Sequence, residues 1–277
     1  MDSARHDEPA ARPAPVTDDT WSDLRRHTDA RIALGRCGVS LPHGRWLDFR
    51  MAHAKARDAV LTPFDMAGVR AALEQGGEQC LELHSAAADT AEFLARPDKG
   101  RQLSEASRGI LRETVAAQAT GARGADICVV VSSGLSARAV HENAVPFATR
   151  FLAQARAAGY TTTPVALVDH GRVAVADEVA HLLGARLVVM LIGERPGLSS
   201  PNSLGVYLTF APVPGCTDEA RNCISNVRPG GLPIEDGVRK LCYLVQGAFA
   251  AGLTGVNLKD DMPGDYLPFA PAPALAD

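Results

Sequence analysis

The chain lacks an excess of basic residues, a long apolar run and a recognisable secretory signal. Its formal net charge is −4, whereas nucleic-acid-binding proteins usually carry a clear basic excess. No uninterrupted apolar stretch approaches the roughly 20 residues that a membrane span requires. Residues 1–19 have no apolar core and are rich in Pro, Ala and Asp, which predicts a disordered tail and no signal peptide. We therefore expect a cytoplasmic protein that binds neither nucleic acid nor a membrane.

The six cysteines are scattered singly, and no two of them form a C-x-x-C pair. This spacing supports neither a zinc site nor a thioredoxin-like redox motif. Without a signal peptide, reduced thiols are the default. Cys128 lies in a predicted strand and Cys242 in a predicted helix, so both are expected to be small buried hydrophobic residues. The sequence predicts no metal-binding residue in this chain.

The motifs of several enzyme classes are also absent. The loop 132–137, SSGLSA, has one glycine where a dinucleotide site needs G-x-G-x-x-G after the first strand. No segment matches G-x-x-x-x-G-K-[ST], G-x-S-x-G or H-E-x-x-H. These absences disfavour an independent nicotinamide-dependent oxidoreductase, a P-loop enzyme, a serine hydrolase and a zinc protease.

What the sequence does contain is a change of pattern near residue 121. Before it, helical spacing predicts mainly helices, with one short strand, at 20–35, 46–60, 65–75, 79–84 (the strand) and 103–115. After it, buried-strand patterns alternate with helical ones, which predicts a parallel sheet. The expected strands are 127–131, 165–168, 187–193 and 205–210; the expected helices are 137–157 (broken near Pro146), 173–183 and 233–252; and 211–232 is expected to be a loop.

The predicted fold class is therefore α/β, with a helical N-terminal domain at 20–120 and a Rossmann-like parallel-sheet domain at 121–260. The tails 1–19 and 261–277 are expected to be loose. Right-handed crossovers should bring the loops 132–136, 169–173 and 193–198 to one sheet edge, where open α/β sheets bind ligands. Glu194 and Arg195 in the last loop fit either a ligand site or a plain turn with a solvated ion pair. From the residues alone, a binding domain for a large or unusual ligand is as far as the prediction goes.

Five segments of the chain resemble the small subunit of ethanolamine ammonia-lyase. They are LRRHTDARIALGR from Leu24, RPDKGRQL from Arg96, VVVSSGLSARAV from Val129, HGRVAVADEVAHLLGARLVVMLIGERPGL from His170 and RNCISNVRPGG from Arg221. The resemblance extends over about residues 24–258, and its GERPGL and CISN segments are the most specific part.

This resemblance implies a subunit of an adenosylcobalamin-dependent lyase that converts ethanolamine to acetaldehyde and ammonia by a radical mechanism. In that family the large subunit is a TIM barrel that holds the substrate, and the small subunit encloses the cobalamin in a hetero-oligomer. The D-x-H-x-x-G cobalamin motif is absent, so no histidine here is expected to bind cobalt. The N-terminus lacks the amphipathic helix that some members use for packaging, which leaves enclosure in a bacterial microcompartment open.

Carried over by position, the family's cobalamin contacts fall on Val173, Glu194 and Cys223. Gly134 and Ser136 are added because their loop should share the same sheet edge. Ser133 stands where the family more often has an acidic residue. No catalytic acid or base is assigned to this chain. The alternative from another class is a non-catalytic scaffold subunit that binds a partner, without a cofactor, through the basic helical region around Arg25 and Arg50.

Overall fold

The computed structural model describes residues 15–117 and 124–269. The chain divides into two compact units, Met1–Lys55 and Ala56–Asp277. The predicted domain boundary at 120/121 lies outside the described residues, as do residues 1–14 and 270–277 of the predicted tails. The helix α1 (His43–Leu61) contributes residues to both units.

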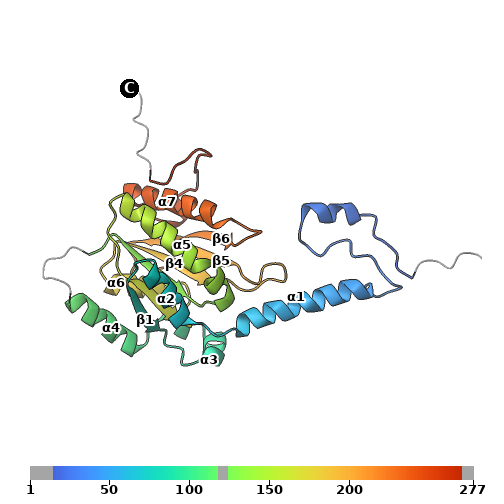
Figure 1. The fold of residues 1–277 in the computed structure, drawn as a ribbon, viewed down its shortest axis with the longest axis horizontal. Coiled ribbons are helices and arrows are strands. Elements are labelled where there is room, and N and C mark those ends of the chain that lie inside the picture. Colours follow the sequence, from blue (N-terminus) through green and yellow to red (C-terminus); the bar gives the residue numbers. More distant parts are fainter. Residues whose placement is uncertain (1–14, 118–123, 270–277) are drawn as a thin grey trace, which may run out of the picture. The chain divides into compact units, whose positions relative to one another are not determined.

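The second unit is built on a six-stranded sheet with the order β1-β3-β2-β4-β5-β6 (Figure 1). The first four strands are mutually parallel, whereas β5 runs antiparallel to both of its neighbours. The strands are β1 (Cys80–His84), β2 (Ile127–Ser132), β3 (Val165–Asp169), β4 (Leu187–Gly193), β5 (Leu204–Phe210) and β6 (Asn222–Val227). The predicted α/β class is confirmed, and the short strand predicted at 79–84 is the edge strand β1.

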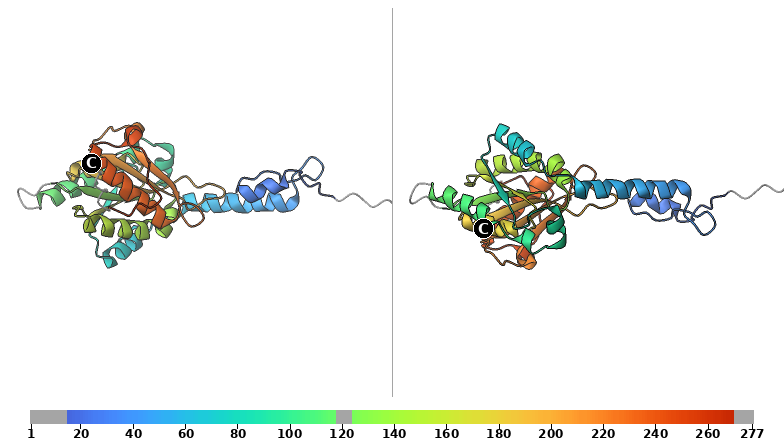
Figure 2. Two further views of the ribbon diagram at one scale, coloured as in Figure 1. Left: turned by 90° about the horizontal axis from the view of Figure 1, so that it is seen from above. Right: turned by 90° about the horizontal axis from the view of Figure 1, so that it is seen from below.

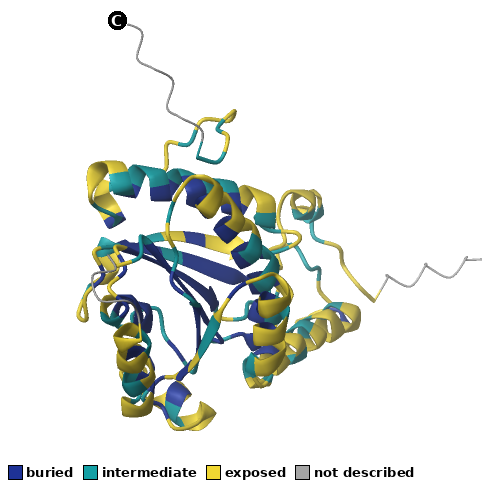
Figure 3. Ribbon diagram, turned by 60° about the vertical axis from the view of Figure 1, so that its left-hand side comes forward, coloured by how far each residue is buried: buried dark blue, intermediate teal, exposed yellow. Residues whose placement is uncertain are grey.

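Helices cover both faces of this sheet (Figures 1 and 2). One core holds α2, α5 and α7 against the sheet, and the other holds α4 and α6. All residues of β2 and β4 are buried, which explains why these strands are continuous apolar runs (Figure 3). The described α-helices after α1 are α2 (Met66–Gln75), α3 (Thr90–Ala95), α4 (Glu105–Ala116), α5 (Ala137–Ala157), α6 (Val175–Leu182) and α7 (Ile234–Ala251).

Two helix predictions are wrong. The segment 20–35 forms only a short 3-10 helix, Ser22–His27, and Trp21 at its N-cap makes no side-chain capping bond. None of its residues is buried, so no packed apolar face supports a longer helix. Pro146 was expected to break a helix, but α5 runs through it without interruption. The fully buried Phe147 and Phe151 fix this helix in the core, and that packing outweighs the local preference of proline.

The predicted loop at 211–232 is also wrong in part, because it contains β6. That strand reads NCISNV, and only Ile224 and Val227 in it are buried. Its polar, half-exposed sequence gives no continuous apolar run. The strand forms because β5 offers a free edge to it, which is a tertiary condition.

Candidate functional site

The loops that follow β2, β3 and β4 lie together at the carboxyl edge of the sheet, as the sequence predicted. The amide of Leu135 donates a hydrogen bond of 2.9 Å to the carbonyl of Gly193, which joins the first loop to the third. The amide of Gly171 donates to the Ser132 hydroxyl at 3.1 Å, which joins the second loop to the end of β2. Three loops from distant parts of the sequence therefore form one surface.

A cavity of about 380 Å³ opens at this surface. Its walls come from all three loops and from β5 and β6. The lining residues are Gly134, Leu135, Arg172, Val173, Ile192, Gly193, Glu194, Arg195, Tyr207 and Ser225. The structure thus brings together three of the five predicted site residues: Val173, Glu194 and Gly134.

Glu194 is held by hydrogen bonds within the chain. Its carboxylate accepts from the Ser225 hydroxyl at 2.6 Å, from the Asn226 amide at 3.2 Å and from the Ser203 hydroxyl. A carboxylate offers about four acceptor positions, so these three donors leave about one for a ligand. Glu194 therefore ties the end of β4 to the start of β5 and to β6, in addition to facing the cavity.

Cys223 does not line the cavity but lies beside it. It is the cross-strand partner of Tyr207, which does line the cavity. Cys223 is exposed as a whole residue, but partial desolvation of its thiol raises its pKa, and burial raises the pKa of the Tyr207 hydroxyl. Both groups are neutral at pH 7. Cys223 can therefore affect a ligand by positioning Tyr207, or it can contact the ligand through its neutral, polarisable sulfur.

Ser136 is not available to a ligand. Its side chain is fully buried, and its hydroxyl donates to the Pro201 carbonyl at 2.9 Å. The same oxygen accepts from the Ala139 amide at 3.2 Å and caps the N-terminus of α5. Ser136 positions the loop, whereas Gly134 in the same loop reaches the cavity.

Sequence reasoning missed Arg172, which precedes Val173 on the cavity wall. Its guanidinium carbon lies 4.3 Å from the centre of the Phe93 ring, and its Nη2 donates to the Phe93 carbonyl at 3.0 Å. Burial, followed by repulsion from Arg101 and Arg195, lowers the pKa of Arg172. Only its neighbour Val173 was carried over from the resemblance, and nothing in the sequence distinguishes Arg172 from other loop arginines.

The family of this chain follows from its similarity to known proteins. A family model described as ethanolamine ammonia-lyase light chain (EutC) matches residues 18–259. The chain belongs to the ethanolamine ammonia-lyase light-chain family. The predicted family is confirmed, and the match includes every residue of the cavity wall.

Relatives of this light chain are each named ethanolamine ammonia-lyase small subunit. A protein of Pseudomonas putida is 55% identical over 247 residues, which are 89% of this chain and 90% of the relative. One from Ralstonia nicotianae is 54% identical over 254 residues, or 92% and 93% of the two chains. One from Pseudomonas fluorescens is 54% identical over 246 residues, or 89% and 88%.

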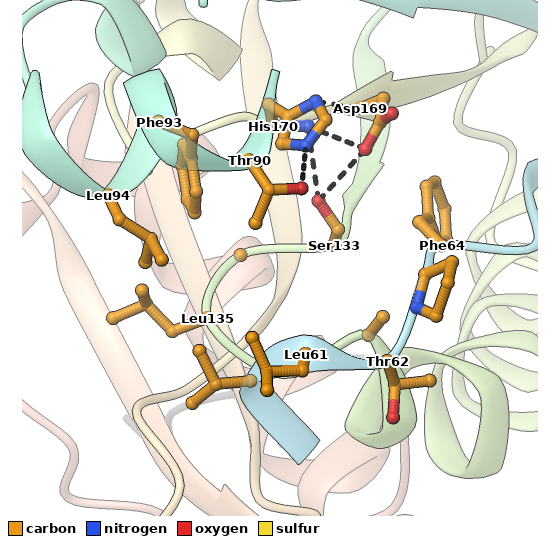
Figure 4. A pocket seen from close by; sticks show the side chains of 14 residues that line it. Leu61, Thr62, Phe64, Thr90, Phe93, Leu94, Ser133, Leu135, Asp169 and His170 are labelled. Atoms are coloured by element: carbon orange, nitrogen blue, oxygen red, sulfur yellow. Dashed lines mark hydrogen bonds and ion pairs between the residues drawn. The ribbon is translucent and has the colours of Figure 1, made fainter. Parts of the chain in front are cut away.

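A smaller cavity, of about 200 Å³, also has Gly134 and Leu135 in its wall (Figure 4). Ser133, Asp169 and His170 meet there, but they do not form a catalytic triad. The His170 ring contacts Asp169 at 3.2 Å and the Thr90 hydroxyl at 3.0 Å, whereas the Ser133 oxygen contacts Asp169 at 3.4 Å and the His170 backbone amide at 3.1 Å. The serine hydroxyl is thus not hydrogen-bonded to the imidazole ring.

These contacts instead hold the loop after β3 in place. His170 adopts a positive φ of 54°, which is uncommon for a residue with a side chain. The bonds to Asp169, Ser133 and Thr90 stabilise that conformation and set the course of the chain toward Arg172 and Val173. Ser133 therefore has a defined structural role in this loop.

In the part of the light chain that the structure describes, no helix is long and apolar enough to cross a membrane.

Proposed function

We propose that this chain is the small subunit of an adenosylcobalamin-dependent ethanolamine ammonia-lyase, which converts ethanolamine to acetaldehyde and ammonia. The family match over residues 18–259 carries this proposal. The chain's part is to bind the cobalamin at the carboxyl edge of its sheet and to enclose it. A large subunit holds the substrate. Location in the cytoplasm and packaging in a microcompartment stay predictions.

The residues around the larger cavity fit a cobalamin. The corrin rim carries amide groups, which need both donors and acceptors. The cavity offers the remaining acceptor position of Glu194, the hydroxyl of Ser225 and apolar walls at Val173 and Leu135. The Arg172 Nε is buried without a hydrogen-bond partner among the described residues. A buried donor without a partner is costly, so the chain holds the Arg172 side chain on the cavity wall at an energetic cost.

When bound, adenosylcobalamin would supply the radical chemistry of the reaction. The residues of this chain position the cofactor and exclude water, and none of them is assigned as an acid or base. The hydrogen bonds of Glu194 to Ser203, Ser225 and Asn226 keep the cavity wall rigid, which is the condition for holding a large cofactor in one orientation.

Reconstitution tests this function. The chain is mixed with the large subunit, adenosylcobalamin and ethanolamine, and acetaldehyde is assayed, with controls that omit each component. We expect activity that requires both chains and the cofactor. Assembly without activity and without cobalamin absorbance would favour the scaffold alternative. If the chains do not assemble even when they are co-expressed, the proposal is wrong.

A second experiment tests the assigned role of Glu194. The variant Glu194→Gln replaces one acceptor oxygen by a donor group that faces existing donors. We expect cofactor affinity to fall about tenfold, the loss of roughly one charge-assisted hydrogen bond. The exposed Glu235→Gln on α7 is the matched control. Unchanged cofactor affinity and turnover in Glu194→Gln would contradict the role.

A further inference from the structure

Two arginines on the wall of the larger cavity have no acidic partner. Among the described residues, Arg172 and Arg195 form no ion pair with a carboxylate. Glu194 lines the same cavity, but its carboxylate is engaged by Ser203, Ser225 and Asn226. The described cavity wall therefore carries two guanidinium groups against one carboxylate, and neither guanidinium forms an ion pair with that carboxylate.

The positive charge of Arg172 lies in surroundings that disfavour it. Repulsion from Arg101 and Arg195 adds to the cost of its partial burial, and its Nε is left without a partner. The side chain cannot turn away freely, because it packs on the Phe93 ring and donates to the Phe93 carbonyl. The Arg172 amide is also fixed, donating to the Gly100 carbonyl at 2.7 Å. A positive charge that is partly buried and held in one position is expected where a negatively charged ligand binds.

The N–H donors of the two arginines indicate the chemical class of the ligand. Guanidinium groups bind planar or tetrahedral oxyanions with several N–H donors at once, and they suit phosphate esters particularly well. The cofactor of the proposed function carries one such group, the phosphodiester of its nucleotide arm.

We propose that Arg172 and Arg195 bind the phosphodiester of the cobalamin nucleotide arm. This inference rests on the proposed function and adds the residues that recognise one part of the cofactor. It assigns Arg172 a contact from the half-buried part of the cavity wall and Arg195 a contact from an exposed part of the same wall. Arg101 contributes through its charge only.

Three probes distinguish the contribution of the phosphate to binding affinity from that of the rest of the cofactor. They are adenosylcobalamin, adenosylcobinamide phosphate, which keeps a phosphate but lacks the base, and adenosylcobinamide, which lacks both. Equilibrium dialysis with the complex of both subunits, without substrate, measures the affinity for each. In the wild-type complex we expect the two phosphate-bearing probes to bind more tightly than adenosylcobinamide, by a margin that shrinks as salt is raised.

The variants are Arg172→Gln and Arg195→Gln. We expect Arg172→Gln to lower the affinity for the two phosphate-bearing probes by about tenfold to a hundredfold, and exposed Arg195→Gln by up to about fivefold. Neither should change the affinity for adenosylcobinamide. Arg150→Gln is the control, since Arg150 lies on α5 and its guanidinium is 3.8 Å from the exposed Glu235 carboxylate. If Arg172→Gln does not fold, the probe affinities of Arg195→Gln and the salt dependence of the wild-type affinities still test the inference.

An equal loss for all three probes would overturn the inference, because it would mean that the arginines only shape the cavity. No loss in either variant would overturn it as well. These results leave the proposed function intact. A wild-type complex that binds none of the three probes would instead refute the proposed function, and this inference with it.

Discussion

Replacing Gly134 by alanine tests whether the three loops meet as closely as the structure shows. Gly134 has a φ of 55°, in the left-handed region. A Cβ atom there would lie 2.2 Å from the carbonyl oxygen of Gly193 and 2.5 Å from the Ile192 Cγ1. Both distances are far shorter than van der Waals contact, and the oxygen belongs to the backbone at the end of β4. The loops after β2 and β4 would have to separate.

The cost has two parts, and a second glycine separates them. Gly252 ends α7 with a φ of 67°, and a Cβ atom there would meet nothing within 4 Å. Gly252→Ala should therefore cost only the left-handed conformation, about 1–2 kcal/mol of the free energy of unfolding. Gly134→Ala should cost the same plus the overlap, about 1–3 kcal/mol more.

Urea unfolding followed by circular dichroism measures both variants against the wild type. We expect a lower midpoint with an unchanged slope, and a larger drop for Gly134→Ala than for Gly252→Ala. Cobalamin affinity should fall only in Gly134→Ala, because only that loop lines the cavity. Equal losses of stability in the two variants would refute the close approach of the loops.

Other predictions concern groups around the site. Arg221 and Asp177 form a buried ion pair that joins the start of β6 to α6. Arg221→Met alone should lower the free energy of unfolding by about 3–5 kcal/mol, because it leaves the Asp177 carboxylate buried without its partner. In urea unfolding, the double variant Asp177→Leu/Arg221→Met should regain most of that lost stability. A double variant no more stable than the single one would contradict this. Burial raises the pKa of Cys223, so its alkylation by iodoacetamide in the isolated chain should reach half its maximal rate above the ordinary thiol value of about 8.5. Because the folded pKa is the higher one, any stability from this thiol is complete at lower pH and is lost as pH rises through that value. A rate that levels off by pH 8 would show that the thiol is not shielded.

The sequence by itself determined the centre of the sheet. β2, β3 and β4 are short apolar runs bounded by Gly, Asp and Ser, and such runs are buried wherever helices cover both faces of a sheet. The order of strands and helices then places the three following loops at one edge, since parallel connections are right-handed. Val173, Glu194 and Gly134 could therefore be predicted to lie together before any contact was known.

Only the tertiary structure decided how that edge is completed. β6 forms on the free edge of β5, and the segment 20–35 lacks the expected helix because none of its residues is buried against the described part of the chain. The partners of Glu194, the burial of Ser136 and the unpaired Nε of Arg172 all depend on contacts between segments far apart in the chain. Periodicity records only which face of a local element is apolar. Which polar atoms find a partner is settled when distant segments meet, because the energy of a buried hydrogen bond or charge depends on the group opposite it.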